Sequence, residues 1–182
     1  MTQLISVCRE AISENKASFI IGYTEDKHHH LKPYIAHDVE EAEKLTFNCN
    51  AVNNLAVFIH RFRNPSQGKI GIVVKPCDLK TINALIQENR IKREDLYVIG
   101  VNCGGVVADQ AKEFSKENTQ IKCRNCASKT PAWFDVVVGE PAEFELPDDD
   151  MAILMKQIDE MTPEQRLEFW NTEFEKCLKC YA

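Results

Sequence analysis

The sequence predicts an α/β fold built on a mostly parallel sheet with flanking helices. Two apolar runs rich in β-branched residues, GKIGIVVKPCD (residues 68–78) and LYVIGVNCGG (residues 96–105), flank the helix-like segment TINALIQENRIKRED. A strand, a helix and a second strand in this order form a parallel crossover unit. Two further strands are predicted from ASFIIGYTE (residues 17–25) and FDVVVG (residues 134–139).

Several helices are predicted around these strands. Apolar residues recur with helical spacing in residues 3–15, where Cys8 is expected to be a small core residue. Asp38 with Glu41 fits a capping pattern for the short helix VEEAEKL. The stripe in AVNNLAVFIHRF predicts another helix, and ADQAKEFSKENT (residues 108–119) is expected to be a short exposed one.

A change of composition near residue 140 predicts a domain boundary. The acidic, proline-bearing segment EPAEFELPDDD follows, and then two helical segments, the second beginning at Thr162-Pro163-Glu164-Gln165 with a capping pattern. We therefore expect an α/β domain at residues 1–140 and a helical arm at residues 141–182.

Charge and cysteine usage exclude several classes of protein. The chain has 22 basic and 28 acidic residues, a net charge of −6, and no basic block that would favour nucleic acid. Arg9, Glu10 and Glu14 interrupt the first apolar residues, so neither a signal peptide nor a membrane-inserting helix is expected there. A cytoplasmic protein with eight cysteines is more often metal-binding or redox-active than disulfide-bonded.

Four cysteines are the candidate metal ligands. Cys77 and Cys103 follow the two strands of the crossover, and parallel strands end at the same edge of a sheet, so both thiols should face one crevice. The Cys-x-x-Cys of IKCRNC adds Cys123 and Cys126. Cys77 also lies at a predicted helix start, two residues after Lys75, so we expect its thiolate to be favoured.

Three interpretations compete for these thiols: an iron-sulfur cluster, a zinc site and unligated cysteines. Four thiolates suit zinc or a cluster, but two ligands arriving singly from strand ends favour a cluster. A thioredoxin-like pair would open a helix, and residues 127–131 do not look helical. Asn102-Cys103-Gly104-Gly105 could offer N–H groups to a cluster or a phosphate, although a Gly-Gly pair can also be a simple turn.

Other candidate ligands are weaker. His28, His29 and His30 could bind a metal or cofactor phosphates, but adjacent side chains point alternately, which favours a solvated loop. Cys49 could be a fifth ligand or a buried thiol, and the lack of a neighbouring cysteine favours the buried thiol. Cys177 and Cys180 have the spacing that begins a ferredoxin ligand run, so they form a partial second cluster motif in a truncated ferredoxin-like segment, or a lone pair of terminal thiols.

A family resemblance rests on three stretches of the chain. IGIVVKPCDLKTINALIQENRIKREDLYVIGVNCGGV, KPYIAHDVEEAEKLTFNCNAVNNLAVFI and IKCRNCASKTPAWFDVVVGE resemble the beta subunits of deazaflavin-dependent hydrogenases and formate dehydrogenases. The resemblance covers roughly residues 17–140 and the terminal CLKCYA. Its most specific part is the order of Cys77, Cys103 and the Cys123/Cys126 pair.

The resemblance implies an iron-sulfur electron-transfer subunit of a cytoplasmic oxidoreductase complex. It implies that Cys77, Cys103, Cys123 and Cys126 ligate one 4Fe-4S cluster, with Lys75, Asn102 and Gly104 near the cluster or a flavin. Many members bind FAD, although no dinucleotide fingerprint or P-loop is present. The implied partners are the catalytic subunit of a hydrogenase or formate dehydrogenase, and ferredoxin or a deazaflavin. The alternative is a zinc-stabilised structural or adaptor domain.

Overall fold

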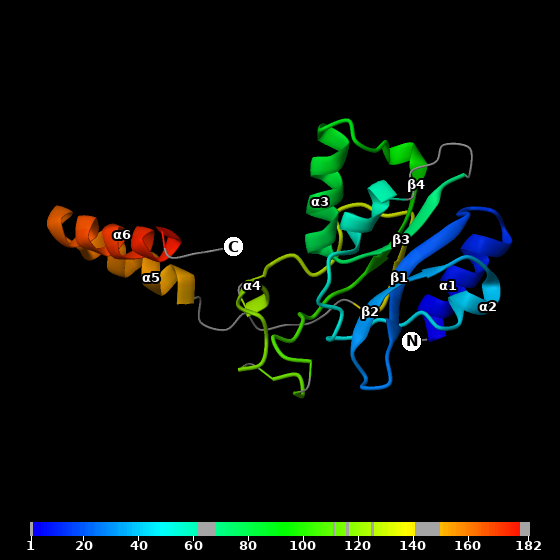
Figure 1. The fold of residues 1–182 in the computed structure, drawn as a ribbon, viewed down its shortest axis with the longest axis horizontal. Helices are drawn as coiled ribbons and strands as arrows, with labels where there is room; N and C mark the ends of the chain where they lie inside the picture. The colour runs from blue at the N-terminus through cyan, green and yellow to red at the C-terminus, as the bar shows by residue number, and fades with distance from the viewer. Residues whose placement is uncertain are drawn as a thin grey trace. The chain divides into compact units, whose positions relative to one another are not determined.

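A computed structural model describes residues 2–61, 68–110, 112–115, 117–124, 126–140 and 150–178 (Figure 1). The chain divides into two compact units, residues 1–145 and residues 146–182. The first contains a sheet with helices on both faces, and the second contains two helices. Within the described residues, no helix is both long and apolar enough to cross a membrane.

The first unit is built on a five-stranded sheet of order β2-β1-β3-β4-β5. All neighbouring strands are parallel except β1 and β2, which form an antiparallel hairpin at one edge. This architecture confirms the predicted mostly parallel α/β fold. The strands are β1 (Phe19–Glu25), β2 (Leu31–Ala36), β3 (Ile70–Val74), β4 (Leu96–Val101) and β5 (Val136–Val138).

The central strands are buried on both faces, which is why they are continuous apolar runs in the sequence. Every residue of β3 is buried, and β4 is buried except at Tyr97. The β3–β4 register pairs Ile70 with Leu96 and Val74 with Gly100. The carboxyl ends of the two strands therefore lie side by side, as the crossover predicted.

Helices cover both faces of this sheet (Figure 1). On one face lie α1 (Thr2–Ser13) and α2 (Val39–Ala42), and on the other lie α3 (Pro76–Gln87) and the 3-10 helix η1 (Leu55–Arg61). The 3-10 helix η3 (Arg93–Asp95) precedes β4. The helix predicted from the stripe in residues 51–62 is thus a 3-10 helix over Leu55–Arg61, which buries Leu55, Ala56 and Ile59, and residue 62 lies outside the described residues.

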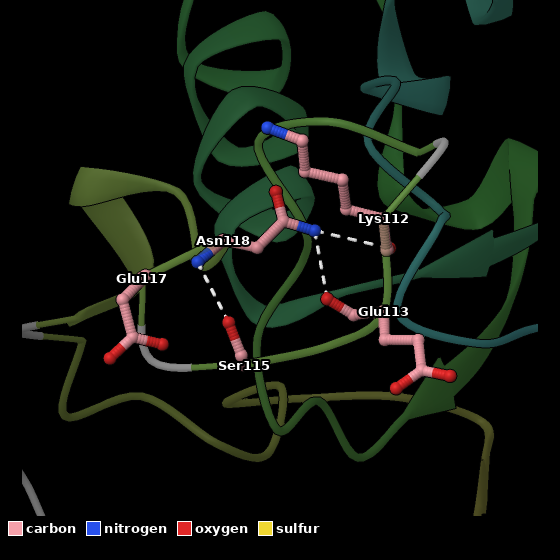
Figure 2. Close-up of a pocket in the computed structure, with 5 residues that line it drawn as sticks. All are labelled: Lys112, Glu113, Ser115, Glu117 and Asn118. Carbon is pink, nitrogen blue, oxygen red and sulfur yellow. Dashed lines mark hydrogen bonds between the residues drawn. The ribbon is translucent and has the colours of Figure 1, made fainter.

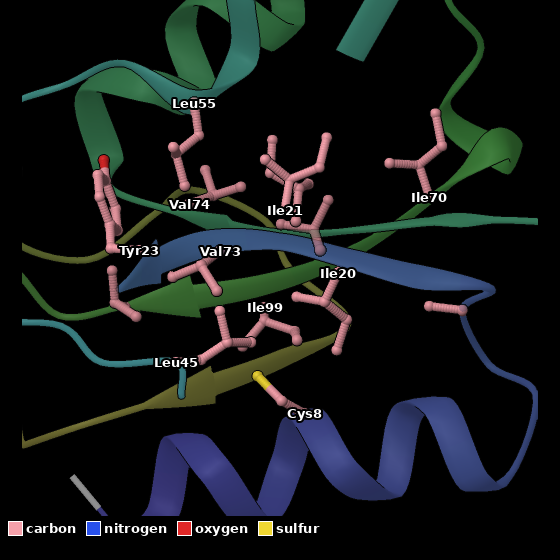
Figure 3. Close-up of a cluster of buried hydrophobic side chains, with 14 of the residues drawn as sticks. Cys8, Ile20, Ile21, Tyr23, Leu45, Leu55, Ile70, Val73, Val74 and Ile99 are labelled. Carbon is pink, nitrogen blue, oxygen red and sulfur yellow. The ribbon is translucent and has the colours of Figure 1, made fainter. Parts of the chain in front are cut away.

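The core lies between the sheet and these helices (Figure 3). Cys8 points from α1 toward the sheet and is fully buried, which confirms its predicted role as a core residue. Burial raises the pKa of its thiol to about 12, so this cysteine is protonated at neutral pH.

The hairpin between β1 and β2 contains the three consecutive histidines. The Asp26 carboxylate accepts hydrogen bonds from the backbone N–H groups of His28 and His30, and His29 has a positive φ of 63°. His29 also contacts the Glu25 carboxylate. The histidines therefore make an exposed β-turn, and the strand that follows them, β2, was missed by the sequence prediction.

The predicted helix at residues 108–119 is wrong for the residues that the structure describes there. They form a loop organised by Asn118, whose side-chain amide donates to the carbonyl oxygens of Asp109, Lys112 and Glu113 at 2.9–3.1 Å (Figure 2). A side chain that binds backbone carbonyls competes with helix formation. The loop encloses a pocket of about 320 Å³ (Figure 2).

The second unit is a pair of helices, α5 (Asp150–Glu160) and α6 (Pro163–Leu178), as predicted. Thr162 Oγ1 accepts from the N–H of Gln165, and Gln165 Oε1 accepts from the N–H of Thr162. This reciprocal capping box confirms the predicted helix start. Residues 141–149 of the acidic connector lie outside the described residues.

Replacing Asn118 should destabilise the first unit. In an Asn118→Ala variant, three backbone carbonyls lose their amide donor, and we expect a loss of about 1–3 kcal/mol in the free energy of unfolding. Urea unfolding monitored by circular dichroism measures this change. Gln87→Ala, at an exposed position of α3, should change the free energy by no more than about 0.5 kcal/mol. Equal stability of the two variants would contradict the role assigned to Asn118.

Candidate metal centre

The four candidate cysteines line one pocket at the carboxyl edge of the parallel strands. Its volume is about 40 Å³, and the thiols reach it from three segments of the chain. The remaining lining residues include Gly105, from the predicted glycine turn, and a serine and two lysines that the sequence prediction did not select. The lining residues are Pro76, Cys77, Cys103, Gly105, Lys122, Cys123, Cys126, Ser128 and Lys129.

Cys77 is the second residue of α3 and follows Pro76 at the start of the helix. Its thiol donates to Asp78 Oδ1 at 3.7 Å. Burial raises the pKa of the Cys77 thiol to about 11 and the neighbouring Asp78 raises it further, whereas Lys75 and Lys122 act in the opposite direction. The expected favoured thiolate is therefore wrong for the metal-free protein, because burial raises the pKa of Cys77 by more than the two lysines lower it.

Cys103 lies in the turn after β4. Its backbone N–H donates to the carbonyl of Lys129 at 2.9 Å, which ties this turn to the segment after the Cys-x-x-Cys. Burial raises the pKa of its thiol, and a backbone hydrogen bond from Gly105 opposes that shift. Gly105 has a φ of 125°, a conformation that favours glycine, so the second glycine of the pair supplies the N–H donor.

Cys123 and Cys126 lie in and just after a one-turn helix, α4 (Ile121–Arg124). The N–H of Cys126 donates to the carbonyl of Cys123 at 3.4 Å, and the Cys126 thiol contacts the Ser128 carbonyl at 3.3 Å. The Arg124 guanidinium donates to the carbonyls of Thr119 and Glu117, which fixes this turn. The helix ends between the two cysteines, so the motif does not have the thioredoxin arrangement.

A buried ion pair lies next to Cys77. Lys75 and Asp78 are 2% and 1% exposed, and their side chains approach to 2.8 Å. The Lys75 ammonium also donates to the carbonyl of Asn53 at 2.7 Å and to the Tyr23 hydroxyl. Asp78 Oδ2 has no aligned hydrogen bond besides this ion pair. Lys75 is thus fully engaged beneath the pocket rather than lining it.

The charge of Lys75 acts on the thiols from this buried position. It lowers the pKa of both Cys77 and Cys103, opposing the larger effect of burial. Burial raises the pKa of Tyr23, and the charges of Asp78, Cys77 and Cys103 raise it further. Lys75 is therefore a fixed positive charge close to two of the four candidate ligands.

The other predicted site residues do not enter the thiol pocket. The Asn102 amide donates to the Gly139 carbonyl at 2.6 Å and accepts from the Thr130 hydroxyl at 2.6 Å, so it ties β4 to β5. Asn102 lines a separate pocket of about 100 Å³. Gly104 and Cys49 are not among the described lining residues. Cys49 is partly exposed, like the neighbouring residues 47–50 of its polar turn, so the prediction of a buried thiol is wrong. The side chain of Cys177 and all of Cys180 lie outside the described part of the chain.

The donor set fits a soft metal but not a preformed site for one ion. All four side chains are thiols, the ligands that zinc and iron-sulfur clusters share. Across the described ranges, no three His, Cys, Asp or Glu side chains are close enough together to hold a single metal ion. The pocket therefore gathers the four sulfurs without focusing them on one point.

Fold and pocket together define an α/β domain with four thiols at the carboxyl edge of a parallel sheet. Residues 67–180, more than half of the chain, match the family model for the C terminus of the coenzyme F420 hydrogenase/dehydrogenase beta subunit. The chain belongs to this family of beta subunits, as the sequence resemblance indicated.

Individual relatives match over short segments. The chain is 46% identical over 39 residues to the F420-dependent formate dehydrogenase 1 subunit beta of Methanococcus maripaludis. It is 42% identical over 40 residues to the corresponding subunit of Methanocaldococcus jannaschii. These segments span 21% and 22% of this chain, and 10% and 11% of the relatives.

A solved structure with a similar chain is the F420-reducing NiFe hydrogenase complex of Methanosarcina barkeri. The match has a TM-score of 0.48 and 15% sequence identity, and it covers 59% of this chain and 38% of that one.

Removing the Lys75 ammonium should destabilise the fold. A Lys75→Met variant leaves the Asp78 carboxylate buried without its partner, and we expect a loss of about 3–5 kcal/mol in the free energy of unfolding. A Lys75→Met/Asp78→Leu variant removes both charges and should recover most of that loss. Urea unfolding of the metal-free protein measures both. A double variant as unstable as the single one would show that the ion pair is not the source of the effect.

Proposed function

We propose that the thiol pocket holds one 4Fe-4S cluster and that the chain is an iron-sulfur electron-transfer subunit of an oxidoreductase complex. The observation that carries this proposal is the arrival of Cys77, Cys103, Cys123 and Cys126 in one pocket from three segments. When bound, such a cluster accepts and releases single electrons.

The way in which the ligands reach the pocket favours a cluster over zinc. Structural zinc sites usually gather their ligands from two short Cys-x-x-Cys segments. Cys77 and Cys103 instead arrive singly, after β3 and β4, and Cys123 and Cys126 arrive as a pair. Four thiols presented in this way suit an iron-sulfur cluster.

The surrounding residues are suited to holding a negatively charged group. The Gly105 N–H already binds the Cys103 sulfur, and such bonds are one means by which a protein tunes a cluster. The buried Lys75 supplies a nearby positive charge. With a pKa of about 11, Cys77 is protonated at neutral pH, so metal binding must displace its proton.

Family membership supports the wider role. The relatives with matching segments are named as beta subunits of F420-dependent formate dehydrogenases. On this basis we propose a catalytic dehydrogenase or hydrogenase subunit as the partner, ferredoxin or a deazaflavin as the redox partner, and FAD as a second cofactor. We place the protein in the cytoplasm, where unpaired cysteines such as the six described here remain reduced.

Metal analysis of anaerobically purified protein tests the proposal. We expect brown protein with iron and acid-labile sulfide in nearly equal amounts, whereas colourless protein with one zinc would support a structural scaffold. Flavin extracted from the same preparation and identified by chromatography tests FAD.

A Cys103→Ser variant should lose most of the iron and sulfide, because it removes a ligand anchored at the end of β4. Cys49→Ser is the matched control, since Cys49 is outside the described lining of the pocket, and its iron content should not change. Iron per folded chain, measured after gel filtration, reports the effect. Unchanged iron and sulfide in the Cys103→Ser protein would exclude this cysteine as a ligand.

A further inference from the structure

Positive charge gathers around the thiol pocket although the chain as a whole is acidic. Lys122 and Lys129 line the pocket itself. Lys80 lines a neighbouring pocket of about 90 Å³, which shares Pro76 and Ser128 with it. None of the described lining residues of either pocket is a carboxylate. The described side chains that line the two pockets therefore carry positive charge, whereas the whole chain has a net charge of −6.

The Asp78 carboxylate, which lies next to Cys77, does not cancel the charges of Lys80 and Lys122. Asp78 is 1% exposed and is paired with Lys75 beneath the pocket. Lys80 and Lys122, by contrast, are exposed, and they come from the separate elements α3 and α4. An approaching molecule therefore meets lysine side chains at the opening of the pocket.

Two large apolar side chains are exposed close to the same pocket. Ile121, the residue before Lys122, is 79% exposed. Phe114 is 44% exposed. Its ring packs close to Gly105, which lines the pocket: the Cζ atom lies 3.7 Å from the point where a Cβ atom would stand if residue 105 had one. Apolar side chains surrounded by charged ones are the usual composition of a transient protein interface.

We propose that this lysine face, defined by Lys80, Lys122, Lys129, Ile121 and Phe114, docks an electron-carrier protein with an acidic surface. The inference rests on the proposed function, because it assigns the protein that exchanges electrons with the cluster. One electron passes from the reduced carrier to the oxidised centre, and no bond or proton is transferred.

The lysines and the exposed apolar side chains together favour an acidic protein over a small anion as the molecule that binds this face. Lysines at the rim steer an acidic partner toward the pocket, and such steering raises association rates by one to three orders of magnitude at low salt. A small anion would contact the lysines but would leave Ile121 and Phe114 in water. A protein surface covers both, and electron-transfer encounters need only a small interface.

Stopped-flow electron transfer with two probe proteins tests the docking. An acidic plant-type 2Fe-2S ferredoxin is used as the reduced donor to the full, cluster-loaded chain, and basic mitochondrial-type cytochrome c as the oxidised acceptor from it. For the unmodified protein, the rate constant with ferredoxin should fall steeply as salt is raised, while that with cytochrome c should not fall.

Charge reversal at the face is compared with the same reversal elsewhere. Lys80→Glu/Lys122→Glu should slow the reaction with ferredoxin by about tenfold or more at low salt and speed up the reaction with cytochrome c. Lys69→Glu/Lys92→Glu is the matched control, because these exposed lysines precede β3 and β4 at the opposite edge of the sheet. It should leave both rates within about twofold. Ile121→Ser should slow the ferredoxin reaction without changing its salt dependence.

The outcomes separate this inference from the proposed function. Equal effects of the two double variants, with iron content and reduction potential unchanged, would overturn the docking face and leave the cluster intact. Loss of bound FAD in Lys80→Glu/Lys122→Glu, with no effect on the ferredoxin rate, would assign the lysines to a small anionic ligand and also overturn it. Protein that binds no iron would overturn the proposed function itself.

Discussion

The parallel hydrogen bonding of β3 to β4 is the constraint on which the candidate site depends. It pairs Val74 with Gly100, and three residues beyond each of these lie Cys77 and Cys103. Paired strands are about 4.8 Å apart, so the two thiols start from neighbouring positions before any loop contributes. The segment carrying Cys123 and Cys126 then lies against this edge, tied to it by the hydrogen bond from Cys103 to Lys129.

Burial, rather than the position at a helix start, dominates the electrostatics of this edge. It raises the pKa of Cys77 and of Cys103, even though Lys75 lies close to both. A buried ammonium is costly to desolvate, and Asp78, Tyr23 and the Asn53 carbonyl together offset that cost. The same network that stabilises the fold therefore keeps a positive charge beneath a site rich in sulfur.

Sequence patterns predicted the features that depend on continuous or periodic burial. The strands β3 and β4 and the capping box at Thr162 were predictable because each depends on residues that are close together in the sequence. The strands are continuous apolar runs, and the capping box needs only Thr162 and Gln165. The strand β2 was missed because its burial is uneven and it follows a polar turn. The loop at Asn118 was mistaken for a helix because the side-chain amide of Asn118 binds carbonyls five to nine residues earlier, and no repeating pattern in the sequence marks these bonds. The grouping of Lys80 with Lys122 depends on tertiary folding and has no signal in either segment.

The equal three-residue interval from the paired residues Val74 and Gly100 to Cys77 and Cys103 has a consequence for which changes of length the crossover tolerates. The far end of α3 and the turn that leads to β4 lie away from the thiols, so insertions there would leave the sulfurs in place. One residue added between Val74 and Cys77 would instead shift the Cys77 sulfur along the chain, so that it would no longer lie beside Cys103 at the end of the paired strands. Tolerance of length changes should therefore differ sharply between the two ends of a single crossover.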